Sequence, residues 1–196
     1  EGVNTDNLPD ISVSAIDTSL SNIKHLNNEP KDVFIVKDKH GNVLDGAGQN
    51  RREIHPHVVA AIPKILLDIP PLDFNIVVFP AAGGSGSVIS GEIIAELLKR
   101  DEKVIALIIG ASDTTRNAEN SLNVLRGLEN ISVKCDRPVI ARYYENGTDG
   151  TRAEVDRKVT ADLILLLTLL SGNNGELDTR DLYNWLNYPK VTSFKP

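Results

Sequence analysis

Disulfides and membrane-spanning segments have little support in this 196-residue sequence. Its single cysteine, Cys135, cannot form an intramolecular disulfide or a thiolate metal cluster, which fits a reducing cytoplasm. The longest apolar run, residues 163–170, is too short to span a bilayer. The first ten residues lack the basic and apolar regions of a secretory signal. We therefore expect a protein that is neither secreted nor inserted into a membrane.

Positive charge is also scarce. The chain has 21 Lys and Arg residues against 27 Asp and Glu, and its net charge is −6. An acidic chain without a basic cluster argues against direct binding to nucleic acid or to an anionic membrane. The histidines at 55 and 57 have no third ligand nearby, so no metal site within the protein is expected. With 41% hydrophobic residues, the chain can bury one sizeable core.

A glycine-rich turn is the most informative feature that is present. Residues 74–100 read FNIVVFPAAGGSGSVISGEIIAELLKR, an apolar strand followed by the turn and an amphipathic helix. Its glycines can adopt positive φ and let backbone N–H groups approach an anion, and its serines add hydroxyl donors at the positive end of the helix dipole. The residues concerned are Gly83, Gly84, Ser85, Gly86 and Ser87. The turn predicts phosphate binding, with an ordinary strand-to-helix connection as the alternative.

Two common phosphate-binding loops do not fit this turn. A P-loop requires Gly-Lys-Ser/Thr, and no lysine follows these glycines. The dinucleotide fingerprint requires a third glycine three residues after Gly86, where Ile89 stands. A different type of phosphate-binding loop is therefore expected.

The hydrophobic pattern alternates between strand and helix periods. Strands are predicted at 11–16, 33–37, 75–79, 104–109 and 139–143, and helices at 56–67, 88–100, 117–128, 153–170 and 179–187. This alternation predicts the α/β class, with a parallel sheet covered by helices on both faces. In such sheets ligands bind beyond the carboxyl ends of the strands. Polar loops follow every predicted strand, although Asp17 and Asp113 also fit ordinary turns or helix caps.

Four segments carry a resemblance to one protein family. The segment AAGGSGSVISGEI looks like the tubulin signature loop, DGAGQNRREIHPHVVAAIPKIL like the preceding loop and helix, GASDTTRNAENSLNVLRGLE like the ribose-side loop and helix, and GELDTRDLYNWLN like the loop that completes a neighbouring subunit's site. They lie in the same order along residues 11–187. The chain thus resembles the tubulin/FtsZ superfamily of GTP-dependent filament proteins, and within it the PhuZ-type tubulins of large bacteriophages.

The resemblance implies a site for GTP or GDP with Mg²⁺. The phosphates would lie on the glycine-serine loop and on the preceding loop, and the ribose beside the loop that begins at residue 110. The residues added by this assignment are Asp17, Ala47, Gly48, Gln49, Asn50, Ser112, Asn117 and Asn120. Asn146 and Asp156, ten residues apart, resemble the pair that contacts guanine. A carboxylate at Asp156 can accept hydrogen bonds from guanine but not from adenine, while its alternative role is to complement a helix dipole.

Hydrolysis is implied to need a second subunit. Asp178 and Asp181 lie three residues apart at a predicted helix start, so both face one side of the helix. In the family such residues enter the next subunit's nucleotide site and orient the attacking water. Asp178 follows Asp156 by 22 residues, the interval found in FtsZ-like proteins, and Glu176 is a further candidate. The alternative for the two aspartates is a helix cap with a dipole-compensating carboxylate.

The resemblance also has departures. The strand and glycine-rich loop with which family members begin have no counterpart here, and Ala82 and Gln49 replace family glycines. We expect a GTP-binding domain at 1–170, and at 171–196 the catalytic-loop helix with the start of a truncated second domain. The implied function is a GTPase that forms head-to-tail homopolymers and positions phage cargo in the host cytoplasm. A non-catalytic filament or scaffold protein with a degenerate site is the main alternative, and a Rossmann enzyme, disfavoured by Ile89, is another.

Overall fold

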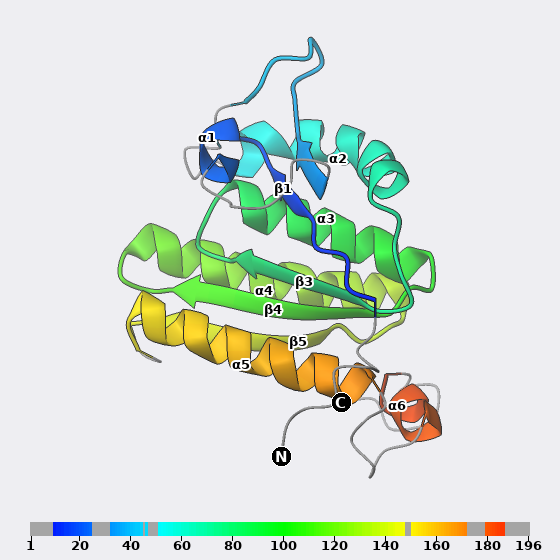
Figure 1. Cartoon of the computed structure of the whole chain (residues 1–196). Helices are drawn as coiled ribbons and strands as arrows, with labels where there is room; N and C mark the ends of the chain where they lie inside the picture. The colour runs from blue at the N-terminus through cyan, green and yellow to red at the C-terminus, as the bar shows by residue number, and fades with distance from the viewer. Residues whose placement is uncertain are drawn as a thin grey trace.

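The computed structural model describes residues 10–24, 32–44, 46, 51–147, 150–171 and 179–186. Strands and helices alternate along these residues (Figure 1). The order is β1 (Ala15–Asp17), α1 (Leu20–Ile23), β2 (Val33–Ile35), α2 (Arg51–Asp68), β3 (Asn75–Pro80), α3 (Ser85–Lys99), β4 (Val104–Ala111), α4 (Thr115–Cys135), β5 (Ile140–Asn146), α5 (Arg152–Leu170) and α6 (Thr179–Leu186). All the described strand ladders are parallel, which confirms the α/β class. None of the described helices has the length and hydropathy that a bilayer crossing requires.

The described strands form two parallel sheets rather than one. One has the order β3-β4-β5, and the other contains β1 and β2. In the larger sheet Asn75 pairs with Val104, and Ile105 pairs with Ile140. The smaller sheet aligns Ala15 with Val33. Because each strand ladder is parallel, the loops that follow β3, β4 and β5 share one edge of the sheet.

The central strand β4 supplies both hydrophobic cores. Val104, Ala106 and Ile108 face the core formed with α2, α3 and α4. Ile105 and Leu107 point to the opposite face and pack with Tyr144 and α5. This alternation follows from the two-residue period of a strand, and it explains why the sequence of β4 is apolar throughout. Helices therefore cover both faces of the sheet, as the sequence predicts, with α3 and α5 on opposite sides (Figure 1).

Several element boundaries differ from the predicted ones. Helix α2 begins at Arg51 and continues through Pro56 and Pro63. Two prolines disfavour a helix, but α2 buries a stripe of apolar residues that includes Ile54 and Val58, and this packing outweighs propensity. Helix α4 extends beyond its predicted end at 128 as far as Cys135, strand β1 has only three residues, and the short helix α1 was not predicted.

Candidate functional site

The glycine-serine loop connects the carboxyl end of β3 to the start of α3. Gly84 is the N-cap of α3, and no side chain caps this helix end. The backbone N–H groups of Ser85, Gly86 and Ser87 belong to the first turn, where no partner within the helix exists. These donors lie at the positive end of the helix dipole. The arrangement suits an anion such as a phosphate group.

The glycines of this loop do not use positive φ, contrary to our expectation. Gly84 has φ −79°, and the described glycines with positive φ are Gly41, Gly46, Gly147 and Gly150. The reason is that the chain enters α3 directly from the loop. Gly86 packs closely against β3 instead, because a Cβ atom there would lie 3.0 Å from Cδ of Pro80.

Both serine hydroxyls of the loop bind the protein itself. Ser87, which is only 2% exposed, donates from Oγ to the carbonyl oxygens of Gly83 at 2.7 Å and Gly84 at 3.0 Å. The Ser85 hydroxyl lies 2.7 Å from that of Thr18, which follows β1. Thr18 was not predicted as a site residue, although it stands at the end of a strand. These bonds brace the loop and leave its backbone N–H groups as the donors for a ligand.

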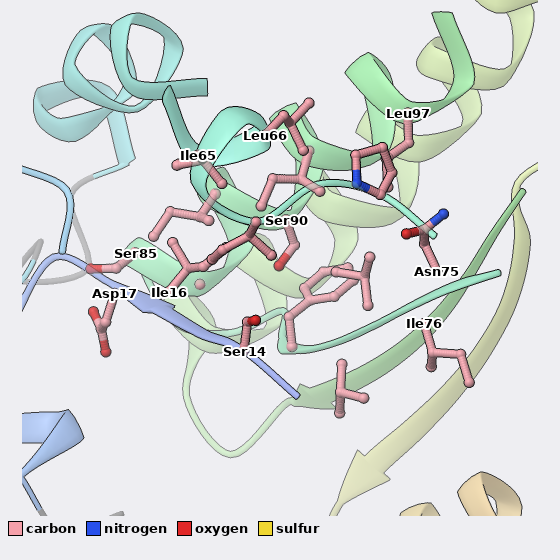
Figure 2. A pocket seen from close by; sticks show the side chains of 18 of the residues that line it. Ser14, Ile16, Asp17, Ile65, Leu66, Asn75, Ile76, Ser85, Ser90 and Leu97 are labelled. Atoms are coloured by element: carbon pink, nitrogen blue, oxygen red, sulfur yellow. The ribbon is translucent and has the colours of Figure 1, made fainter. Parts of the chain in front are cut away.

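Two more of the predicted residues also have partners within the protein. Asn120 is buried and donates from Nδ2 to the carbonyl oxygen of Ala82 at 3.0 Å, so that α4 holds the loop from a second side. The Asp17 carboxylate accepts hydrogen bonds from the backbone N–H of Thr18 at 2.6 Å and from Nδ2 of Asn22 at 3.0 Å. The contacts of Asp17 are therefore those of an ordinary turn residue, the alternative given above. Asp17 also lines the same cavity as Ser85 (Figure 2).

A second cavity, of about 790 Å³, lies between the ends of β3, β4 and β5. Gly83, Asn117 and Asn146, three of the predicted residues, line it together. Asn117 donates from Nδ2 to Asp113 at 2.6 Å. The Asn146 Oδ1 atom is buried, and it has no hydrogen-bond partner among the described residues. A buried acceptor without a partner is costly, and this atom is placed to accept a hydrogen bond from a ligand in the cavity.

Residues at the start of α5 also line this cavity, and the sequence analysis did not predict them. Arg152 and Glu154 line the cavity. Glu154 and Thr151 form a capping box, a signal readable in the sequence as Thr-x-x-Glu. The backbone and side-chain hydrogen bonds from Thr151 lower the pKa of Glu154, which favours its carboxylate form.

The remaining predicted residues are not brought to this cavity. Asp156 is exposed on α5 and is absent from the cavity lining, and Ser112 is exposed in the loop after β4. Asp181 is exposed in the first turn of α6. The other predicted residues, Ala47, Gly48, Gln49, Asn50, Glu176 and Asp178, lie outside the described residues. Arg51, directly after the predicted loop, is partly enclosed, and burial lowers the pKa of its guanidinium.

Comparison with known proteins identifies the relatives of this chain. It is 33% identical over 189 residues to a phage tubulin-like protein of Pseudomonas phage PhiPA3. The aligned region covers 96% of this chain and 58% of that relative. By sequence, the chain is a relative of the phage tubulin-like proteins. A phage tubulin-like protein of Pseudomonas phage phiKZ is 30% identical over 186 residues, 91% of this chain and 56% of that protein. This phage tubulin-like chain thus spans little more than half the length of these curated relatives. No protein-family model matches it.

Solved structures agree with this family assignment. A protofilament of TubZ from bacteriophage PhiKZ superposes with a TM-score of 0.85 at 29% identity, over 93% of this chain and 57% of that one. The phage tubulin PhuZ in complex with GDP gives a TM-score of 0.74 at 30% identity, over 90% of this chain and 55% of that one. A CetZ protein from Methanosaeta thermophila, at 21% identity and a TM-score of 0.68, shares the fold. These structures show that the chain has the tubulin/FtsZ-like fold.

Proposed function

We propose that this chain is the nucleotide-binding part of a GTP-hydrolysing protein that assembles head to tail into dynamic filaments. The filament is proposed to act in the cytoplasm of an infected bacterium, where it positions phage DNA or the phage nucleus. The observation that carries the proposal is the start of α3, which no side chain caps, beside a cavity that contains the Asn146 Oδ1 atom, for which the described residues supply no hydrogen-bond partner. The GDP named with PhuZ and the protofilament named for TubZ support it.

The nucleotide is proposed to lie along the edge at which the strands end. The backbone N–H groups of the first turn of α3 bind its phosphates, together with the loop at 47–50. Asn117 lies at the ribose, with Ser112 beside it, and Asn146 receives a donor from the base. Asp156 stands at the family spacing from Asn146, although it lies outside the lining of the cavity, and it is proposed to accept hydrogen bonds from N1–H and the 2-amino group of guanine. Asn120 and Ser87 position the loop rather than touch the ligand.

A magnesium ion fits this arrangement only if the nucleotide phosphates supply most of its non-water ligands. The described residues contain no cluster of three or more His, Cys, Asp or Glu side chains that could hold a metal. Mg²⁺ usually keeps several waters and takes its other ligands from substrate phosphates and one or two carboxylates. When bound, the ion neutralises charge that develops on the phosphates.

Catalysis is proposed to be shared between neighbouring subunits. Asp181, with Asp178 and Glu176, enters the nucleotide site of the next subunit and orients water toward the γ-phosphate. We assign residues 1–170 to nucleotide binding and 171–196 to this catalytic segment. One subunit then supplies the phosphate loop and the next the carboxylates. Such a heterologous contact repeats without closing and generates an open filament.

The test is GTP hydrolysis per subunit as a function of protein concentration, with light scattering recorded in the same sample. We expect the rate to rise steeply above a threshold concentration together with the scattering. Asp181→Asn should bind GTP and assemble, but lose most of the hydrolysis. Filaments that form equally well without GTP, with no hydrolysis at any concentration, would replace the proposal by the non-catalytic scaffold.

A further inference from the structure

Helix α5 is attached to the sheet through few buried side chains. It packs along β5 (Figure 1). Two of its 19 residues, Val155 and Val159, are buried, whereas α3 buries eight of its 15. Leu163 and Leu166 add partly buried contacts to the same core. The attachment of α5 to the sheet is therefore mainly a narrow apolar stripe.

This stripe does not define the position of α5 along its own axis. The apolar residues at 155, 159 and 163 are four residues apart, and residue 167 is again a leucine. Apolar contacts have no preferred direction. A shift of the helix by one turn, about 5.4 Å, would therefore place Val159 and Leu163 where Val155 and Val159 now lie. A different kind of contact has to select one of these positions.

A polar cluster between β5 and α5 makes that selection. The Tyr144 hydroxyl donates to Oδ2 of Asp162 at 2.7 Å, and Nε of Arg142 lies 2.8 Å from the same oxygen. Tyr144 is 2% exposed, and the side chain of Asp162 is 25% exposed. The Arg142 guanidinium also lies 5.6 Å from the centre of the Tyr144 ring. Two strand residues thus bind one carboxylate of the helix.

A shift of α5 by one turn would break this cluster. Either Leu166 or Lys158 would then take the place of Asp162, and neither side chain carries an acceptor for the Tyr144 hydroxyl. A buried hydroxyl without a partner is costly. Buried polar contacts can fix the register of packed helices in this way. Asp162 therefore distinguishes between positions of α5 that the apolar stripe leaves nearly equal.

The cluster lies close to the cavity that contains Asn146. Tyr144 and Asn146 are two residues apart on β5, so their side chains share a face and are separated by about 6.6 Å along the strand. On the helix, the observed register places Arg152 and Glu154 in the lining of this cavity. A shift of one turn would move both residues by more than the length of a hydrogen bond.

We propose that Asp162 is a positioning residue for the base of the bound nucleotide. By fixing the register of α5 on β5, it holds the start of α5 in place beside Asn146. This inference rests on the proposed function, in which Asn146 and Asp156 contact guanine. Asp162 is itself absent from the cavity lining. Its loss should therefore weaken recognition of the base and leave the phosphate subsite at the start of α3 unchanged.

The test measures the affinities for GTP and ATP by competition, at protein concentrations below the threshold for assembly. The double variant Tyr144→Phe, Asp162→Leu replaces both hydrogen-bonding partners by apolar groups, a change that is often nearly neutral for stability. Arg142, whose side chain is 65% exposed, loses its partner at little cost. We expect this variant to fold and its preference for GTP over ATP to fall about tenfold or more, since the base contacts are misplaced. Its affinity for ATP should change little.

Two further variants separate register from stability. Val159→Ala removes packing from the same interface but keeps the polar cluster. It should lower the urea midpoint of unfolding, because a buried side chain is truncated, and retain the preference for GTP. Asp162→Asn keeps an oxygen that can accept from the Tyr144 hydroxyl, so it should retain most of the preference.

The results that would overturn the proposal are specific. A double variant that keeps the wild-type preference for GTP would do so, because the register would then not depend on Asp162. Val159→Ala losing as much of the preference as the double variant would also do so, because packing alone would explain both results. A wild-type chain that binds GTP and ATP equally would instead refute the base contacts of the proposed function, and this inference with them.

Discussion

Ser87→Ala distinguishes a hydroxyl that braces the loop from one that contacts a ligand. The Ser87 side chain is 2% exposed and donates to the carbonyl oxygens of Gly83 and Gly84. The Gly84 carbonyl is the N-cap acceptor of α3, so it keeps a partner in the variant, while the Gly83 carbonyl loses its bond with Ser87. We therefore expect Ser87→Ala to destabilise the protein in the absence of any nucleotide.

The size of the effect follows from these bonds. The Gly83 carbonyl that loses its partner is only partly buried, so the lost hydrogen bond costs about 1–2 kcal/mol, less than the largest penalties for a buried unpaired acceptor. Alanine recovers roughly 0.5 kcal/mol, because it is a better helix former than serine in the first turn of α3. The free energy of unfolding should fall by about 0.5–1.5 kcal/mol, a factor of roughly 2–13 in the unfolding equilibrium.

Urea unfolding of the nucleotide-free chain, followed by circular dichroism, measures this change. Ser85→Ala is the matched control, because its hydroxyl bonds to Thr18 rather than to the loop backbone. If Ser87→Ala kept the full free energy of unfolding but lost nucleotide affinity, the hydroxyl would be a ligand contact. The inference that it stabilises the loop through its backbone hydrogen bonds would then be wrong.

Three further predictions concern the loop, the base and the second core. Gly86→Ala should lower the melting temperature, because its Cβ would crowd Pro80 and overpacking costs about 1–3 kcal/mol against the roughly 1 kcal/mol gained in helix propensity; a more stable variant would contradict this. Asp156→Ala should reduce the preference for GTP over ATP in competition binding, and an unchanged preference would remove this residue as the base reader. Burial and the hydrogen bond to Asp162 raise the pKa of Tyr144 from 10.0 to about 12. The neutral phenol is thus favoured in the folded state, so stability should be lost as the pH rises from 10 to about 12, and Tyr144→Phe should remove that slope in alkaline unfolding curves.

The alternation of strands and helices was predictable because β3 and β4 are short apolar runs, and the segments that follow them, α3 and α4, are helices of more than ten residues. Strand β3 and helix α5 lie within one residue of their predicted bounds. The short elements near the start were predicted less well. The strand expected at 11–16 overlaps β1 only at its end, and helix α1 was missed, because three or four residues carry too little pattern. The separation of the sheets was also unpredictable, because hydrophobicity indicates a strand but not its neighbours.

The candidate site was predictable in position more than in detail. Strand ends bring Gly83, Asn117 and Asn146 to one cavity, as expected for a parallel sheet. Spacing along the sequence does not set where a side chain points. On α5, Val155 turns into the core, and the next residue, Asp156, is rotated by about 100° and is exposed. The bonds of the Ser85 hydroxyl depend on a contact with a distant part of the chain, which no local pattern records.

The position of β4 in both hydrophobic cores has a consequence for folding. One strand supplies alternate residues to the α3 side and to the α5 side, so its displacement would open both cores at once. The two layers of the larger sheet should therefore unfold as one cooperative unit. Leu107→Ala and Ile108→Ala truncate side chains on opposite faces of β4 and therefore remove contacts from different cores. Each variant should lower the stability of the same cooperative unfolding transition.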